Sequence, residues 1–244
     1  MPDEASVMLP VAILAGGRGT RMAGVTGPTL PKAMLPIAGR PFIDYKLEEL
    51  ARQGVELVYL LVGHGAQAIA DHVGDGLPRG LAVRLVPDGE ALLGTGGAIL
   101  RALPELGPAF WVTFGDNLLS VPIGAAEQAF AAAGRPGLMT VLRNCDQWDA
   151  SNVAVQGDLV TEYGKGAPPG SYEFIDYGMS ILTPEAFVGF KSKEIFDLNA
   201  VIQELIVRRE LTAFEVYERF YEIGSECGYE ETDRRLRGRG EAAD

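Results

Sequence analysis

The chain has 244 residues, which suits one large α/β domain or two small ones. It carries 21 Lys plus Arg against 33 Asp plus Glu, and a net charge of −12 argues against a broad face for nucleic acid or an anionic membrane. Two cysteines without CxxC spacing and only two histidines argue against a disulfide framework, a structural zinc site and a histidine-rich metal site. The acidic N-terminus differs from a signal peptide, and no apolar run reaches the roughly 20 residues that span a bilayer. We therefore expect a cytoplasmic protein that binds any phosphate with a few cations in a cleft.

Strand and helix patterns alternate over the first 144 residues. Short apolar runs that end at a glycine or a polar residue predict buried strands, and apolar residues three and four positions apart predict helices. Such alternation is typical of a mostly parallel sheet covered by helices. In chain order we expect a strand over 11–16, a helix over 41–54, a strand over 55–63, a helix over 66–76, a strand over 81–88, a helix over 96–106, a strand over 109–116, a helix over 121–134 and a strand over 137–144.

The pattern changes after Asn144. A β-hairpin is expected to turn at Gly157 and Asp158, because this pair lies between two stretches of strand-like residues. The glycine- and proline-rich segment 164–171 is the best candidate for a mobile loop. The remaining expected elements are the hairpin over 151–165, a strand over 172–182, a helix over 199–210, two short strands over 211–225, a closing helix over 226–236 and a frayed tail over 237–244.

A glycine-rich loop follows the first strand in "VAILAGGRGTRM", residues 11–22. A backbone without side chains can turn successive amide groups inward to bind an anion, and ligands of open α/β sheets gather at the carboxyl ends of strands. The GxGxxG motif fails because Met22 occupies its last position, and GxxxxGK[ST] does not occur. The loop therefore indicates an anion site of another kind, with a tight turn that only packs as the alternative.

Two cations follow this loop. Lys32 lies in "TLPKAMLPIAGRPFIDY", residues 29–45, shortly after Arg21. A single lysine is usually a solvated surface group. In a chain poor in cations, however, these two could together neutralise a polyphosphate.

A carboxylate ends the strand "FWVTFGDN" at Asp116. A side chain at the carboxyl end of a parallel strand faces the same cleft as the glycine loop. Mg²⁺ prefers oxygen ligands and is commonly held by one or two carboxylates plus substrate phosphates. Asp116 is therefore a candidate metal ligand, with a turn or a helix cap as the alternative.

These motifs resemble a known family. "LAGGRGTRM" followed by "PKAMLPIAGRP" is similar to the LAGGxGTRL…PKPMxPxxGxP pattern of sugar-1-phosphate nucleotidyltransferases, and the resemblance continues through "LLGTGGAIL", "FGDN", "FIDYGMSIL" and "YEIGS" over nearly the whole chain. It is greatest to the short members that act on heptose or hexose 1-phosphates. The resemblance implies an α/β, Rossmann-like, three-layer α/β/α nucleotidyltransferase fold with a mostly parallel mixed sheet. It also implies one domain over 1–236, with a nucleotide-binding half at about 7–144 and a sugar-phosphate-binding half at about 145–236.

The resemblance also assigns roles to individual residues. Arg21 and Lys32 would bind the phosphates, and Asp116 and Glu222 would hold Mg²⁺, although Glu222 stands where the family usually has Asp. Gly164 and Asp176 depart from the family's usual Glu and Asn, which puts the sugar in question more than the reaction. A second glycine segment lies in "LLGTGGAIL", and the resemblance implies that it binds the nucleotide. The alternative is that its glycines only let the helix that begins at Gly96 pack closely. The implied nucleotide-binding residues are Ala15, Gly16, Gly17, Gly19, Thr20, Gly94, Thr95 and Gly96, and the implied sugar-phosphate-binding residues are Asn152, Lys165 and Asp176.

The implied reaction joins a sugar 1-phosphate to a nucleoside triphosphate by in-line attack on the α-phosphorus, giving an NDP-sugar and pyrophosphate. A phosphomonoester has its second pKa near ~6, so the nucleophile needs no base, which suits a chain with two histidines. One alternative is a regulatory subunit that binds nucleotide or sugar phosphate without catalysis. Others are a molybdenum-cofactor guanylyltransferase and a cytidylyltransferase with a choline-like or phosphonate acceptor. The triphosphate, the acceptor and a homo-oligomeric state stay open.

Overall fold

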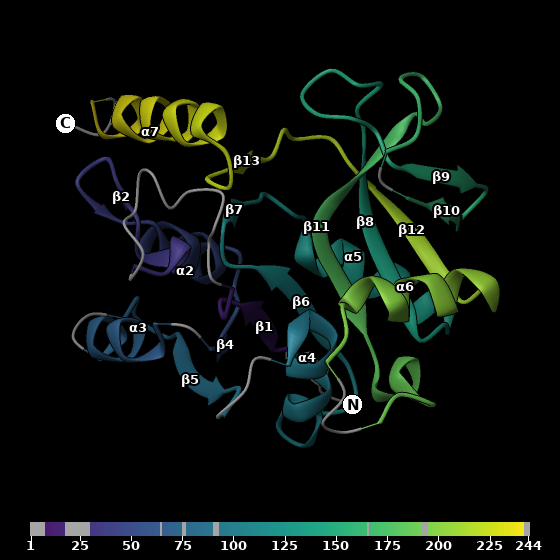
Figure 1. The fold of residues 1–244 in the computed structure, drawn as a ribbon, viewed down its shortest axis with the longest axis horizontal. Helices are drawn as coiled ribbons and strands as arrows, with labels where there is room; N and C mark the ends of the chain where they lie inside the picture. Colours follow the sequence, from purple (N-terminus) through teal and green to yellow (C-terminus); the bar gives the residue numbers. More distant parts are fainter. Residues whose placement is uncertain are drawn as a thin grey trace, which may run out of the picture.

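A mixed β-sheet forms the middle of the protein (Figure 1). In spatial order its described strands are β5 (Ala82–Pro87), β4 (Leu57–Val62), β1 (Val11–Leu14), β6 (Phe110–Phe114), β11 (Phe174–Leu182), β8 (Gly137–Arg143), β12 (Leu211–Val216), β10 (Leu159–Tyr163) and β9 (Val153–Gln156). The computed structural model describes residues 8–17, 30–63, 65–74, 77–89, 93–164, 166–191 and 195–241.

Strand directions differ between the two parts of this sheet. β5, β4, β1 and β6 are parallel neighbours, as the alternation of strand and helix predicts. β11 runs antiparallel between β6 and β8, and β12 runs parallel to β8 but antiparallel to β10. The mixed sheet is confirmed, but it is less parallel than expected, because β11 returns through its centre instead of extending an edge.

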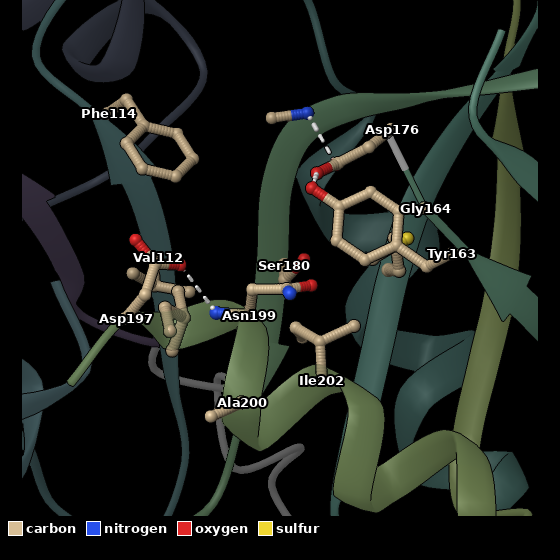
Figure 2. Close-up of a pocket in the computed structure, with 13 residues that line it drawn as sticks. Val112, Phe114, Tyr163, Gly164, Asp176, Ser180, Asp197, Asn199, Ala200 and Ile202 are labelled. Carbon is tan, nitrogen blue, oxygen red and sulfur yellow. Dashed lines mark hydrogen bonds between the residues drawn. The ribbon is translucent and has the colours of Figure 1, made fainter. Parts of the chain in front are cut away.

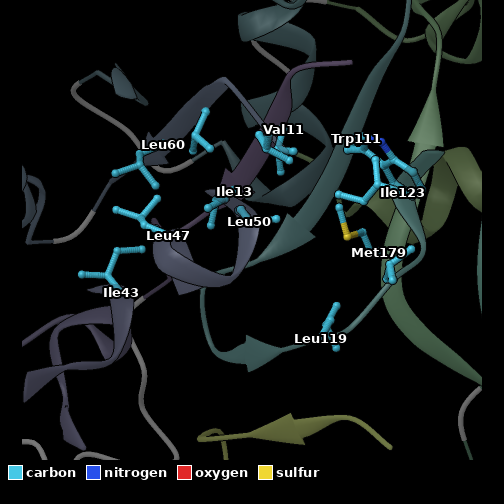
Figure 3. Close-up of a cluster of buried hydrophobic side chains, with 14 of the residues drawn as sticks. Val11, Ile13, Ile43, Leu47, Leu50, Leu60, Trp111, Leu119, Ile123 and Met179 are labelled. Carbon is cyan, nitrogen blue, oxygen red and sulfur yellow. The ribbon is translucent and has the colours of Figure 1, made fainter. Parts of the chain in front are cut away.

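Helices cover both faces of the sheet (Figure 1). Strand residues alternate between two apolar clusters, so that Val11 and Ile13 of β1 pack toward one face and Ala12 toward the other (Figure 3). This arrangement confirms the three-layer α/β/α architecture. The first cluster includes residues of α2 (Phe42–Arg52), α3 (Ala66–Val73) and α5 (Ile123–Ala133), and the second includes residues of α4 (Gly94–Leu106), η3 (Pro184–Phe187) and α6 (Leu198–Val207).

A third, smaller cluster lies beside the main core and joins segments from both ends of the chain. It includes Leu35, Phe42, Leu118, Ile223 and Leu236. It therefore fixes the helix over 226–241 against the start of α2 and against the segments around residues 118 and 223. The elements in and around it are η2 (Lys32–Met34), β2 (Pro36–Ile37), β3 (Arg40–Pro41), β7 (Asn117–Leu118), β13 (Tyr221–Glu222) and α7 (Glu226–Glu241).

Element boundaries differ from the sequence-based expectations at two places. α4 begins at Gly94, two residues earlier than expected, so the glycine segment forms its first turn. α7 continues to Glu241, so the predicted start of a frayed tail after residue 236 is five residues early. The hairpin turn at Gly157 and Asp158 is confirmed by β9 and β10. The division into nucleotide-binding and sugar-phosphate-binding halves stays a prediction. No helix in the described ranges is both long and apolar enough to cross a bilayer.

Candidate active site

The glycine loop begins where neighbouring parallel strands end. Ala15 is buried, and an ideal Cβ placed on Gly16 would lie 2.9 Å from the backbone nitrogen of Gly63, after β4. Position 16 therefore requires glycine for the two chain segments to approach so closely. A Cβ on Gly17 would meet none of the described residues within 4 Å. Three residues predicted to bind nucleotide or phosphate lie outside the described residues, namely Gly19, Thr20 and Arg21.

The two predicted metal ligands lie side by side. Asp116 follows β6, and β7 and β13 form an antiparallel ladder in which Asn117 is opposite Glu222. The amide of Ile223 donates a hydrogen bond of 2.9 Å to the backbone oxygen of Asp116. This short ladder therefore brings together two carboxylates that are far apart in the sequence.

Lys32 lies at the same place. Its Nζ is 3.1 Å from Oδ2 of Asp116. An ideal Cβ on Gly224 would lie 2.8 Å from Oε2 of Glu222, 3.3 Å from Nζ of Lys32 and 3.4 Å from Oδ2 of Asp116. The lysine and both carboxylates therefore converge within 3.4 Å of one point.

This donor set fits a divalent cation that shares its ligands with a substrate. Asp116 and Glu222 supply the one or two carboxylates with which proteins commonly hold Mg²⁺, and substrate phosphates supply further oxygens. Within the described ranges, no group of three or more His, Cys, Asp or Glu side chains is placed to hold a metal ion. The absence of a side chain on Gly224 keeps the space beside both carboxylates open.

The start of α7 holds the carboxylate of Glu222. The backbone amide of Gly224 donates to its Oε2, and the hydroxyl of Ser225 donates to its Oε1 at 2.5 Å. The same hydroxyl accepts a hydrogen bond of 3.0 Å from the amide of Gly228, in the first turn of the helix. These donors fix the orientation of the Glu222 carboxylate beside Asp116.

Replacing Gly228 by Ala should displace this carboxylate. The added Cβ would lie 1.8 Å from Oε1 of Glu222, so the carboxylate must leave its position beside Gly224. We expect turnover to fall by about 10-fold or more, because misplacing a catalytic group by about 1 Å can cost about 10²-fold. The measurement is kcat for pyrophosphate release at several Mg²⁺ concentrations.

Gly238→Ala is the matched control on the same helix, since a Cβ there would meet none of the described residues within 4 Å. Both substitutions add roughly 1 kcal/mol of helix propensity, but only Gly228→Ala presses on Glu222. Equal kcat values for the two variants would contradict the role assigned to Glu222.

The three converging residues lie in a pocket of about 630 Å³, which we call the carboxylate pocket. Across it, the guanidinium of Arg219 lies 5.4 Å from the ring centre of Trp148 and 5.1 Å from that of Tyr221. Arg219 also pairs with Glu231 of α7 at 2.8 Å. Sequence reasoning missed these side chains, because only the fold brings the segment after β8 beside α7. The lining residues are Lys32, Asp116, Trp148, Asp149, Arg219, Phe220, Tyr221, Glu222, Gly224, Ser225, Cys227, Gly228 and Glu231.

A second pocket of about 490 Å³ lies between β11 and α6 and is called the β11 pocket (Figure 2). The carboxylate of Asp176 accepts hydrogen bonds from the hydroxyl of Tyr163 at 3.0 Å and from the amide of Gly178 at 2.9 Å. Burial, reinforced by Asp176, raises the pKa of the Tyr163 hydroxyl, which therefore stays protonated and donating. Asn152 acts behind this group, because its Oδ1 accepts the backbone amide of Asp176 at 2.9 Å. Lys165 lies outside the described residues.

Other polar groups of the β11 pocket come from the start of α6. Asp197 caps this helix by accepting a hydrogen bond of 2.8 Å from the amide of Asn199, and both side chains line the pocket (Figure 2). Sequence reasoning missed them, although an Asp two residues before an Asn at the start of a helix is a visible cap pattern. Phe114, at the end of β6, lies across the pocket from Asp176 (Figure 2).

The second glycine segment packs against the chain just before α6. A Cβ on Gly94 would lie 2.4 Å from the backbone oxygen of Phe196, and one on Gly96 would lie 2.2 Å from its ring. The hydroxyl of Thr95 accepts the amide of Leu198 at 2.8 Å. Close packing therefore accounts for both glycines in this structure, and a role in nucleotide binding stays a prediction.

A buried lysine lies behind the site. Lys46 of α2 is 3% exposed, and its Nζ donates to the backbone oxygen of Asn117 at 2.9 Å and to the side-chain Oδ1 of the same residue at 2.7 Å. Burial lowers the pKa of Lys46 from 10.5 to about 7, while the charge of Asp116 opposes this shift. Sequence reasoning placed the helix but did not single out this lysine.

This lowered pKa should make stability depend on pH. Between about 7 and 10.5 the unfolded chain holds a proton on Lys46 that the folded chain has lost, so folding becomes more favourable as pH rises through this range. Compared with Lys46→Met, the wild type should gain about 2–3 kcal/mol in free energy of unfolding between about pH 6.5 and about pH 9. Urea unfolding of both proteins measures this difference, and a difference that does not vary with pH would contradict the prediction.

Parallel strand ends, a glycine loop, a lysine and paired carboxylates together define a domain built for nucleotidyl transfer. Residues 11–141, more than half of the chain, match the model of the MobA-like NTP transferase domain. The chain belongs to the MobA-like NTP transferase domain family.

Named relatives confirm the resemblance to sugar-1-phosphate nucleotidyltransferases. The chain is 27% identical to D-glycero-alpha-D-manno-heptose 1-phosphate guanylyltransferase of Campylobacter jejuni, over 87% of this chain and 93% of that protein. It is 38% identical to N-acetylmuramate alpha-1-phosphate uridylyltransferase of Caulobacter vibrioides, over 53% of this chain and 54% of that protein. A match of 34% identity to the bifunctional protein GlmU of Saccharophagus degradans covers 55% of this chain but 28% of that longer protein.

Solved structures agree on the fold. HddC from Yersinia pseudotuberculosis, crystallised in complex with GMP-PN, has a TM-score of 0.79 to this chain at 25% identity. The match covers 94% of this chain and 100% of the HddC chain. The nucleotidyltransferase fold expected from the sequence is therefore confirmed.

Proposed function

We propose that this protein is a sugar-1-phosphate nucleotidyltransferase that releases pyrophosphate from a nucleoside triphosphate. One observation carries the proposal: Lys32, Asp116 and Glu222 converge within 3.4 Å of one point beside open strand ends. Family membership and relatives named as guanylyl- and uridylyltransferases support the same reaction.

The protein's own groups serve to bind and align the reactants. Asp116 and Glu222 would hold Mg²⁺, which when bound neutralises phosphate charge and orients the phosphates. The ammonium of Lys32 lies where it can donate to a phosphate oxygen, and Arg21 is expected to do so from the glycine loop. The attacking sugar phosphate is largely dianionic at neutral pH, so positioning and charge neutralisation account for the catalysis.

The β11 pocket is proposed to hold the sugar of the acceptor. Asp176 and Asn199 can accept hydrogen bonds from hydroxyl groups, and the apolar side chains of Val112 and Ile202 can contact carbon-bound hydrogens of a sugar ring. The uncharged sugar of a heptose or hexose 1-phosphate suits this lining, and the Campylobacter jejuni relative is named for such a heptose. Asn152 would act indirectly, by positioning Asp176, and Lys165 is proposed to bind the acceptor phosphate.

The proposed enzyme depends on magnesium, has a cytoplasmic location, and has no nucleic-acid or membrane partner. A homo-oligomeric state is an open alternative.

A pyrophosphate-release screen tests the function. Each of the four common nucleoside triphosphates is incubated with Mg²⁺ and a panel of heptose, hexose and N-acetylmuramate 1-phosphates, with Asp116→Asn as the inactive control. We expect one pair to be turned over by the wild type, with formation of the matching NDP-sugar. Nucleotide binding without turnover across the panel would contradict the proposal and favour a regulatory subunit.

A further inference from the structure

Lys46 carries a buried amino group in the core that the proposed reaction does not use. Its side chain is 3% exposed, and it lines neither the carboxylate pocket nor the β11 pocket. Removing an ammonium group from water is costly unless its donors are satisfied. The hydrogen bonds of the Lys46 amino group compensate this cost, and they identify the segments that the lysine connects.

The first contacts hold the turn that carries Asp116. Nζ of Lys46 donates to two oxygens of Asn117, the backbone oxygen at 2.9 Å and Oδ1 at 2.7 Å. Asn117 directly follows Asp116 and lies opposite Glu222 in the ladder between β7 and β13. The amino group of Lys46 therefore fixes the residue around which both carboxylates are arranged.

The second set of contacts reaches the other pocket. Thr113 of β6, 3.4 Å from Nζ of Lys46, donates from its hydroxyl to the backbone oxygen of Gly178 at 2.9 Å. Nδ2 of Asn117 donates to the same oxygen at 3.4 Å. Gly178 has a φ of +91° in the irregular stretch of β11, and a Cβ there would lie 2.6 Å from Nδ2 of Asn117.

Both sets of contacts include Lys46, and together they connect the carboxylate pocket to the β11 pocket. Gly178 lines the β11 pocket, and its amide donates to the carboxylate of Asp176. Asn117 directly follows Asp116, and Asp116 lines the carboxylate pocket. A shift of the lysine would therefore move the carboxylate pair relative to the β11 pocket.

We propose that Lys46 is a positioning residue that holds the turn bearing Asp116 and the irregular stretch of β11 at a fixed separation. The catalytic role of Lys46 rests on the proposed function, because this separation would set the alignment of acceptor and triphosphate. The structural role of Lys46 does not depend on the reaction, because it follows from the hydrogen-bond network alone.

Hydrogen exchange and kinetics together test the proposal on the full-length protein. Lys46→Met keeps the length of the side chain and removes the donors. Leu50→Ala is the matched control, since Leu50 is a buried residue of the same helix that packs in the main core. A core truncation of this kind lowers stability without touching the network.

We expect amides in 113–119 and in 174–180 to exchange at least about 10-fold faster in Lys46→Met than in Leu50→Ala under conditions of equal global stability. The apparent activation constant for Mg²⁺ should rise, and kcat/KM for the acceptor should fall by about 10-fold or more, while Leu50→Ala stays within about 2-fold of the wild type. Equal exchange in the two variants, or unchanged kinetic constants for a folded Lys46→Met, would overturn the proposal.

A second variant covers a failure of Lys46→Met to fold. Thr113→Val removes the hydroxyl that joins Lys46 to Gly178 and that also lies 3.2 Å from Oδ1 of Asn117. Because Lys46 still holds both oxygens of Asn117, exchange should quicken in 174–180 more than in 113–119. Protection that stays at the wild-type level in 174–180 would overturn the proposal. If the wild type turns over no substrate, the proposed function fails, and the exchange data alone decide whether Lys46 couples the two segments.

Discussion

Replacing Asp116 by Asn should lower kcat by about 10²–10³-fold while the protein stays folded, because an amide cannot replace the charge of a metal-ligating carboxylate. The side chain is 34% exposed and lies beside the open space next to Glu222, so the change of one atom fits without repacking. The backbone of Asp116, which holds Ile223, is unchanged by the substitution. Initial rates of pyrophosphate release over a range of Mg²⁺ concentrations measure the effect.

Asp158→Asn is the control for this substitution. Like Asp116, Asp158 pairs with a basic side chain, and its partner Arg135 lies at 2.6 Å. Asp158, however, lies at the turn of the hairpin formed by β9 and β10, away from both pockets. We expect its kcat and its Mg²⁺ dependence to match the wild type. If Asp116→Asn behaves in the same way, the assignment of the carboxylate pair as the metal site is wrong.

Replacing Lys32 by Met should lower kcat by about 10²-fold, the cost expected when one preorganised donor to a developing charge is lost. Lys32 is 19% exposed, and its ammonium lies 3.1 Å from Asp116, so its charge is held at the place where phosphates would meet the metal ion. Lys32→Arg should recover part of the rate, because the charge returns with a different geometry. Single-turnover kinetics with saturating substrates would separate this loss from weaker binding.

Lys191→Met is the matched control, since it removes one exposed lysine outside both pockets. It should leave kcat unchanged. A Lys32→Met enzyme as fast as this control would mean that Lys32 only pairs with Asp116 in the resting protein.

The sequence predicts the elements well where a local pattern determines them. Continuous apolar runs as short as the one at β4 favour a buried strand over a helix, and the apolar stripe of Ile43, Leu47 and Leu50 places α2 against the core. The parallel direction of β1, β4, β5 and β6 follows from the alternation of strands and helices. The central position of β11 does not, because pairing depends on long-range contacts that no window of residues contains.

The candidate site divides in the same way. Asp116 and Lys32 are visible in the sequence because they end or follow recognisable motifs, and the resemblance adds Glu222. The ladder between β7 and β13 is too short to leave a pattern, so the sequence alone cannot show how the carboxylates meet. Lys46 looks like an ordinary helical lysine, and its burial depends on where Asn117 lies in the folded chain.

The ladder between β7 and β13 also bears on how the protein is made. A ribosome completes β1, β4, β5, β6 and the turn with Asp116 long before it adds Glu222 and α7. A nascent chain can thus begin to fold the core around these strands while it lacks the partner carboxylate. On the proposed function, unfinished or proteolytically clipped copies would consume no triphosphate, because activity begins only when the last helix docks.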